Sequence, residues 1–183
     1  MNHNPMNPTA CRAWSEDLPA AGVDRILFSI APVPFFRRAE QLMELHREVE
    51  SWLGTPFHPH ARIKGVGASC QSFAAELYTR CGFPVPALPL ISLRHFRVHR
   101  ESAIARFIDG ELADRFAPAK LPPDRIPAAG DFLHFEFSDC EHCGVSLGDW
   151  QFAHAHIRRG VVISSLQDPT YGDALKRVWI PVL

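Results

Sequence analysis

The sequence lacks any long hydrophobic run. No stretch of about 18 consecutive apolar residues occurs in the chain, so no transmembrane helix and no membrane insertion are expected. The first residues also lack the basic segment and the apolar segment that a secretory signal requires. We therefore predict a protein without a signal peptide, which is either cytoplasmic, or virion-associated or delivered to the cell wall by another machine.

An excess of charge of either sign is also missing. The 183 residues include 19 Lys and Arg against 20 Asp and Glu, which gives a formal net charge of −1. Proteins that bind nucleic acid or anionic membranes usually carry a broad positive surface, so no nucleic-acid partner is expected. The partner must be recognised by local chemistry, and the composition leaves the oligomeric state undetermined.

A paired set of cysteines is absent as well. The five cysteines stand at positions 11, 70, 81, 140 and 143, which is an odd number at irregular spacing. Such usage argues against a disulfide framework and favours a reducing compartment or a free functional thiol.

The pattern of apolar residues predicts one folded domain after a short arm. Residues 1–22 are polar and rich in proline, and we interpret them as an N-terminal arm, whereas 23–183 are predicted to form a single domain. Apolar residues at helical spacing from position 37 predict a helix that ends at Gly54-Thr55-Pro56. A second helix is predicted to begin at Cys70 and to stop at Cys81-Gly82. Between them we expect a loop.

From Gly130 onward the apolar period changes to two. Short β-rich runs, separated by Gly, Asp and Pro, predict an antiparallel meander. The stretch between residues 87 and 127 is loop-rich, with a helix expected near 101–108. Helices followed by a strand cluster predict an α+β domain in which a helix packs on one face of an antiparallel sheet.

Cys70 is the strongest candidate for a nucleophile. Ser69 stands where an N-cap belongs, so the thiol falls in the first turn of a helix, where free N–H groups and the helix dipole favour the thiolate. The thiol needs a neighbouring side chain that can take up and return a proton near neutral pH, which indicates histidine. His142 and His154 flank a predicted hairpin joined at Gly148-Asp149, which would bring them together across the ladder.

These residues carry a resemblance to a known family. The segments WLGTPFHPHARIKGVGASCQSFAAELY, GDFLHFEF and HCGVSLGDWQFAHAHIRRGVVISSL resemble, in order and spacing, the motifs of the NlpC-like cell-wall cysteine peptidases, nearest to their phage-associated branch. The resemblance spans about residues 52–166. It implies a papain-like fold with Cys70 as nucleophile, His142 as base and His154 as the orienting third residue.

The same resemblance implies a substrate and a reaction. The expected protein is a cysteine endopeptidase that needs no cofactor and cuts peptidoglycan peptide stems beside D-glutamate and a diamino acid. An amidase or a thiol acyltransferase on the same fold is the alternative. A phage-tail or secretion-system module that keeps the fold without catalysis is a further one.

Two positions depart from the family pattern. Ser69 replaces the usual aspartate before the cysteine and can still cap the helix. Phe57 replaces a tyrosine whose hydroxyl helps to hold the oxyanion, so this task would pass to backbone N–H groups or to His58 or His60.

Other interpretations of the same residues remain open. Cys140 and Cys143, with the histidines near them, have spacings that also occur in zinc sites or redox pairs. We expect no metal site, and we interpret the two thiols as incidental. His156 shares a strand face with His154 and is an alternative for the third catalytic position.

Overall fold

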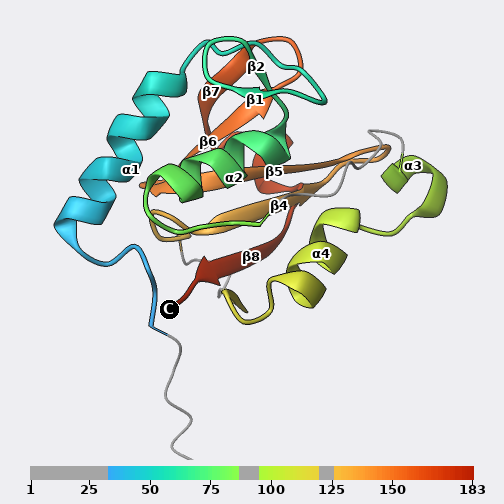
Figure 1. Cartoon of the computed structure of the whole chain (residues 1–183). Coiled ribbons are helices and arrows are strands. Elements are labelled where there is room, and N and C mark those ends of the chain that lie inside the picture. The colour runs from blue at the N-terminus through green and yellow to red at the C-terminus, as the bar shows by residue number, and fades with distance from the viewer. Residues whose placement is uncertain (1–32, 87–94, 120–125) are drawn as a thin grey trace, which may run out of the picture. The chain divides into compact units, whose positions relative to one another are not determined.

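A six-stranded antiparallel sheet forms the centre of the described part of the chain (Figure 1). In spatial order its strands are β3 (Phe116–Pro118), β8 (Leu175–Pro181), β4 (Phe132–Glu136), β5 (Glu141–Gly148), β6 (Gln151–His156) and β7 (Gly160–Ser165). Every neighbouring pair is antiparallel. The predicted α+β class is confirmed.

The computed structural model describes residues 33–86, 95–119 and 126–183. All of them belong to one compact unit of the chain, 32–183. The predicted arm, 1–22, and the predicted start of the domain at residue 23 lie outside the described residues, as do 87–94 and 120–125.

The order of the strands departs from the predicted meander at the last strand. Strands β4 to β7 follow one another across the sheet as expected, but β8 returns to pair with β4 on its free edge, and β3 then pairs with β8. The four residues from Phe132 to Phe135 are all buried, which is typical of a central strand covered on both faces. Periodicity shows which face a residue takes but not which edge the next strand joins.

Two helices cover one face of the sheet. The helix α2 (Cys70–Arg80) packs on β5 and β6, and α1 (Ala39–Trp52) packs beside α2 (Figure 1). Both helices match the predictions, including the cap at Ser69 and the end of α2 at Cys81. The core between this layer and the sheet includes Leu45, Val49, Trp52, Phe73, Leu77, Val145, Ala153 and Ala155.

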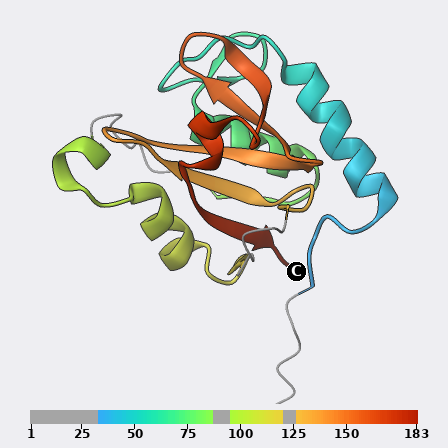
Figure 2. The same ribbon diagram turned by 180° about the vertical axis from the view of Figure 1, so that it is seen from behind.

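The short helix α5 (Pro169–Gly172) lies on the opposite face of the sheet (Figure 2). A second apolar cluster, which includes Tyr171 of this helix, packs there. Tyr171 of α5 contacts the rings of Phe135 and Phe152, with ring centroids 6.0 and 5.0 Å apart. The other helices in the described ranges are α3 (His95–His99) and α4 (Ala103–Glu111), the latter near the predicted position. Both faces of the sheet are therefore covered.

The segment predicted as a loop before Cys70 contains a small hairpin. Strands β1 (Arg62–Ile63) and β2 (Gly67–Ala68) pair around a turn with Gly65 at a φ of 75°. The hairpin was missed because two-residue strands carry no measurable periodicity. It lies against the start of α2 and so helps to fix the position of Cys70.

None of the helices in the described ranges is long and apolar enough to cross a lipid bilayer.

Candidate active site

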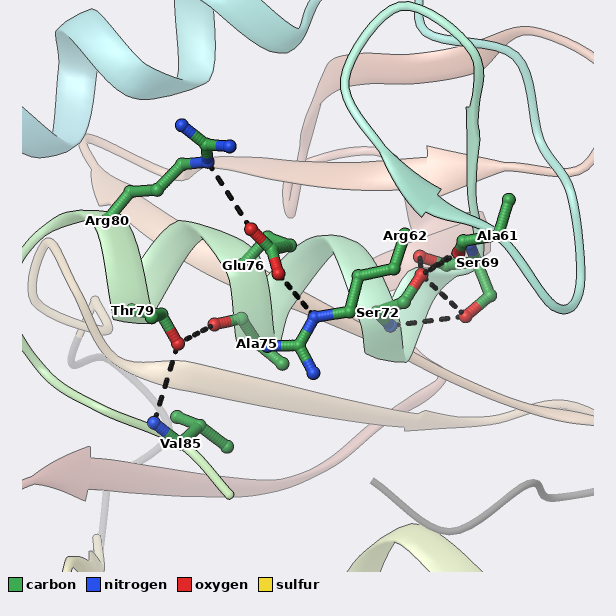
Figure 3. Close-up of polar contacts among 9 residues, drawn as sticks. All are labelled: Ala61, Arg62, Ser69, Ser72, Ala75, Glu76, Thr79, Arg80 and Val85. Atoms are coloured by element: carbon green, nitrogen blue, oxygen red, sulfur yellow. Dashed lines mark hydrogen bonds and ion pairs between the residues drawn. The ribbon is translucent and has the colours of Figure 1, made fainter. Parts of the chain in front are cut away.

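The first turn of α2 holds Cys70 in place through a reciprocal serine cap (Figure 3). Ser72 N donates to Ser69 Oγ at 3.1 Å, and Ser69 N donates to Ser72 Oγ at 2.9 Å. Ser72 Oγ also donates to the carbonyl of Ala61 at 2.7 Å, which ties the cap to the β1–β2 hairpin. Serine therefore performs the capping task at position 69 that the sequence analysis expected.

A partly buried ion-pair network fixes the same helix from its middle. Glu76 pairs with Arg62 of the hairpin and, at 3.3 Å, with Arg80 one turn further along α2 (Figure 3). The Glu76 side chain is 18% exposed, so solvent screens this carboxylate less than it would a surface pair. The helix is thus held at its N-terminus and along its side.

The histidines predicted to face each other across the hairpin are in direct contact. His142 Nε2 lies 2.7 Å from His154 Nδ1, and the ring planes stand 81° apart. His154 is fully buried, stacked on Phe152 at 4.8 Å and in edge contact with Tyr171 at 5.2 Å. The predicted pairing of the two histidines is confirmed as geometry.

Gly144 makes room for this pair. A Cβ atom at position 144 would lie 2.8 Å from the ring of Phe152, 2.8 Å from the carbonyl oxygen of Ala153 and 3.3 Å from the Cβ of His154. Any larger residue would displace the strand that holds His154. The glycine two residues after His142 is therefore a steric requirement of the site.

Cys70 has the electrostatic setting of a thiolate. Hydrogen bonding by Cys143, together with the charge and hydrogen bond of His142, outweighs burial and holds the pKa of Cys70 well below its usual value. Burial and the neighbouring Cys70 raise the pKa of Cys143 well above its usual value. Of the two thiols we assign the anion to Cys70, because it lies in the first turn of α2.

The other described thiols have the opposite setting. Burial raises the pKa of Cys81 to about 12, and burial followed by the charge of Asp139 raises the pKa of Cys140. The described cysteines are all free. Of these four described cysteines, Cys70 alone combines a position at the N-terminus of a helix with a neighbouring histidine.

This contrast predicts the rates of alkylation. At about pH 6, iodoacetamide is expected to label Cys70 at least ~10-fold faster than Cys140, because an ordinary thiol with a pKa of about 8.5 is almost fully protonated there. The pKa of Cys70 is depressed, so its thiolate persists on the acid side, and the ratio should shrink as the pH rises toward 9. Peptide mass spectrometry after timed labelling measures both rates. Equal rates at the lower pH would contradict an activated thiolate.

A cleft of about 480 Å³ opens beside the thiol and the two histidines. Its apolar lining comes from Phe57, Pro59, Phe96, Phe137, Ala155, Ile157 and Tyr171, and its polar lining includes Ser69, Gln71, Arg97, Asp139, Cys140, Glu141, His156 and Thr170. Cys70, His142 and His154 line it as well. A peptide-sized ligand can therefore reach the thiol although Cys70 is only 8% exposed.

The residues that the sequence suggests for contact with the substrate or its oxyanion, Phe57, His58, His60 and Ser69, separate into two groups. Phe57 and Ser69 line the cleft, but Phe57 has no donor and the Ser69 hydroxyl accepts the capping bond from Ser72. His58 and His60 are exposed and do not line the cleft. The backbone N–H of Cys70 lies in the first turn of α2, where N–H groups have no partner within the helix, so it is the remaining oxyanion candidate.

His156 lines the cleft but takes part in a different contact. Its Nδ1 accepts hydrogen bonds from the backbone N–H groups of Arg158 at 3.1 Å and Arg159 at 3.2 Å. The imidazole therefore caps the turn between β6 and β7. The hydrogen bond of His142 runs to His154 instead.

A polar network that the sequence analysis missed adjoins His142 in the chain. Glu141 Oε2 accepts from Ser102 Oγ at 2.6 Å, and its Oε1 accepts from the backbone N–H of Ala103 at 3.2 Å, at the start of α4. His134 Nε2 lies 3.1 Å from Ser102 Oγ. Although burial opposes it, hydrogen bonding by His134 and Ser102 holds the pKa of Glu141 below its usual value. The carboxylate thereby joins α4 to the strand that carries His142.

The cysteines near His142 lie close to Cys70 but form no metal centre. No group of three His, Cys, Asp or Glu side chains within 33–86, 95–119 and 126–183 is arranged to hold a metal ion. Cys143 is fully buried beside Cys70, whereas Cys140 is partly exposed at the cleft. The interpretation of both thiols as incidental stays a prediction, and the contact between Cys143 and Cys70 could not be predicted, because strand alternation does not show which helix residue a buried thiol meets.

These features define a class of protein: an α+β domain with a thiol at the head of a helix, packed on an antiparallel sheet whose neighbouring strands present two linked histidines. Comparison with solved structures identifies the fold as that of the NlpC/P60 proteins. The chain is similar to a lipoprotein-like NLP/P60 family protein from Staphylococcus aureus, with a TM-score of 0.58 and 16% identity over 84% of this chain and 45% of that one. The predicted papain-like, NlpC-type fold is confirmed.

Two further structures show the same fold. An NlpC/P60 family protein from Bacillus cereus gives a TM-score of 0.51 at 18% identity over 75% of this chain and 39% of that one. NlpC2 from Trichomonas vaginalis gives 0.52 at 16% identity over 78% and 49%. The chain therefore spans less than half the length of each of these three proteins. No protein-family model and no curated protein matches the chain, and its predicted place in the phage-associated branch stays a prediction.

Proposed function

We propose that the protein is a cysteine endopeptidase that hydrolyses amide bonds in the peptide stems of peptidoglycan. The single observation that carries the proposal is the chain of contacts from Cys70 through His142 to His154 at the wall of an open cleft. The NlpC/P60 fold and the motif resemblance support the cell wall as the source of the substrate. The bond proposed is the one between D-glutamate and a diamino acid.

The proposed reaction uses Cys70 as nucleophile and His142 as acid and base. The Cys70 thiolate attacks the amide carbonyl, and the resulting oxyanion faces the backbone N–H of Cys70. The His142 imidazolium gives its proton to the leaving amine as the tetrahedral species collapses to a thioester. Neutral His142 then takes a proton from water, which attacks the thioester and frees the acid.

His154 has an orienting role in this mechanism. Burial, followed by the charge of His142, lowers the pKa of His154 to about 2, so the ring stays neutral at working pH. Its Nδ1 can then accept the Nε2 proton of His142 in both the neutral and the protonated states of His142. This fixed hydrogen bond holds the other nitrogen of His142 toward the thiol.

The identity of the cleaved bond tests the proposal directly. Purified peptidoglycan and the muropeptides released from it are incubated with the protein and with buffer alone, and the products are analysed by mass spectrometry. An endopeptidase is expected to give shortened stems with one new amino terminus inside the peptide. Complete stems released from the sugar would indicate an amidase instead. Transfer of an acyl group to an added amine without hydrolysis would indicate a thiol acyltransferase.

A further inference from the structure

A serine on the neighbouring strand extends the chain of hydrogen bonds beyond His154. Ser164 Oγ lies 2.9 Å from His154 Nε2. In the register of β6 and β7, His154 faces Val162 and Phe152 faces Ser164. Ser164 and His154 therefore lie on the same face of the sheet as diagonal neighbours. The contact follows from strand register and does not depend on a loop.

The positions of protons along this chain are interdependent. A neutral imidazole has one N–H and one bare nitrogen. For His142 to donate its Nε2 proton across 2.7 Å, Nδ1 of His154 must be bare. The His154 proton then belongs on Nε2, where Ser164 Oγ is the acceptor. In the other tautomer, two N–H groups would face each other between the histidines.

The surroundings of His154 offer few other hydrogen-bond acceptors for the proton on its Nε2. The ring is fully buried between Phe152 and Tyr171. Besides Tyr171 of α5, the charged or titratable groups near it are His142 on β5, His156 on β6 and Arg159 in the following turn. Arg159 Nη2 lies 3.5 Å from Ser164 Oγ as a second donor to the hydroxyl oxygen. Among the described residues, the Ser164 oxygen is the acceptor available to His154 Nε2.

We propose that Ser164 is a positioning residue that sets the tautomer of His154, and through it the orientation of His142 toward Cys70. This inference rests on the proposed thiol chemistry of Cys70 but not on the identity of the substrate. Ser164 does not line the cleft, so it acts only through the histidines.

The tautomer can be measured without a variant. In wild-type protein with ¹⁵N-labelled histidine, the ¹⁵N chemical shifts of His154 are expected to show a proton on Nε2 and a bare Nδ1 near neutral pH. A proton on Nδ1 would overturn the proposal.

The functional test compares Ser164→Ala with Ser164→Thr, which keeps the hydroxyl, and with Ser165→Ala on the same strand as the control. In Ser164→Ala, kcat is expected to fall about 10- to 100-fold, as happens when a metal-binding histidine loses its outer hydrogen-bond partner, while KM stays unchanged. The midpoint of the pH profile of Cys70 alkylation should shift upward, because an imidazolium at position 142 is less well held. Ser164→Thr should restore much of both values.

Alkylation needs no peptidoglycan, so the two proposals can fail separately. A shifted alkylation profile in Ser164→Ala supports the positioning role even if the wild-type protein cleaves no stem peptide. If wild-type protein cleaves stems and folded Ser164→Ala keeps its kcat and its alkylation profile, the positioning role is wrong and the proposed function stands.

Discussion

The Cys70→Ala variant is expected to lose at least ~10⁴-fold in the rate of stem-peptide hydrolysis. The methyl group cannot form the thioester, so His142 is left without a nucleophile to activate, and only binding and the helix N-terminus remain. The loss should appear in kcat and not in KM, because the side chain of Cys70 forms a small part of the wall of the cleft. Release of new amino termini from purified muropeptides, followed over time, measures both constants.

The matched control for this variant is Cys81→Ala. Cys81 follows the other end of α2, is also 8% exposed, and does not line the cleft. Its replacement should leave kcat within a few-fold of wild type. Hydrolysis that persists unchanged in Cys70→Ala would point to another nucleophile or to a copurifying enzyme, and the proposed mechanism would fall.

The residues of the candidate site were predictable because they are linked by local structure. A hairpin with a short turn brings residues twelve apart into contact, and a helix that begins at Ser69 places Cys70 at its first turn. The turn itself lies one residue later than predicted. Asp149 and Trp150 take positive φ values of 48° and 64°, as a type I′ hairpin turn requires, although a bulky residue such as tryptophan rarely adopts them. In spite of this shift of the turn by one residue, His142 and His154 are in contact as predicted.

The parts that escaped prediction depend on contacts distant in sequence. The pairing of β8 with β4 joins segments about forty residues apart, and no pattern within either segment specifies that edge. The bond between Glu141 and Ser102 likewise spans 39 residues. A serine before a helix predicted the N-cap at position 69. Ser102 caps α4 in the same way, but this second cap was not predicted. The carboxylate partner of that cap could not be identified from the pattern.

The hydrogen bonds of Glu141 help to fix the wall of the cleft beside His142. Its carboxylate lies one residue before His142 and binds the start of α4. The preceding short helix, α3, supplies Phe96 and Arg97 to the cleft. The bonds of Glu141 therefore join α4 to the strand that carries His142, and α4 follows directly on the helix that lines the cleft.

Trp52→Ala is expected to cause the largest loss of stability among single changes outside the site. The Trp52 side chain is fully buried at the end of α1, in edge contact with Phe73 of α2 at 5.7 Å. Lys64 Nζ and the Arg80 guanidinium lie 5.8 and 5.9 Å from its ring centroid. Its truncation removes a large apolar contact and leaves a cavity, at a cost of about 3–5 kcal/mol in the free energy of unfolding. Calorimetry should show a melting temperature roughly 6 to 20 °C lower.

Trp52→Phe separates the contribution of the ring from that of the indole N–H. The Trp52 Nε1 atom is buried and has no hydrogen-bond partner among the described residues, so removing it forfeits no such bond. This variant should therefore lose less than half of the ~3–5 kcal/mol lost by alanine. Met43→Ala, on the same helix at a residue 72% exposed, should stay within about 0.5 kcal/mol of wild type. If Trp52→Ala were no less stable than Met43→Ala, α1 would not be packed on α2, and the support of the Cys70 helix would have to be sought in the Glu76 ion pairs alone.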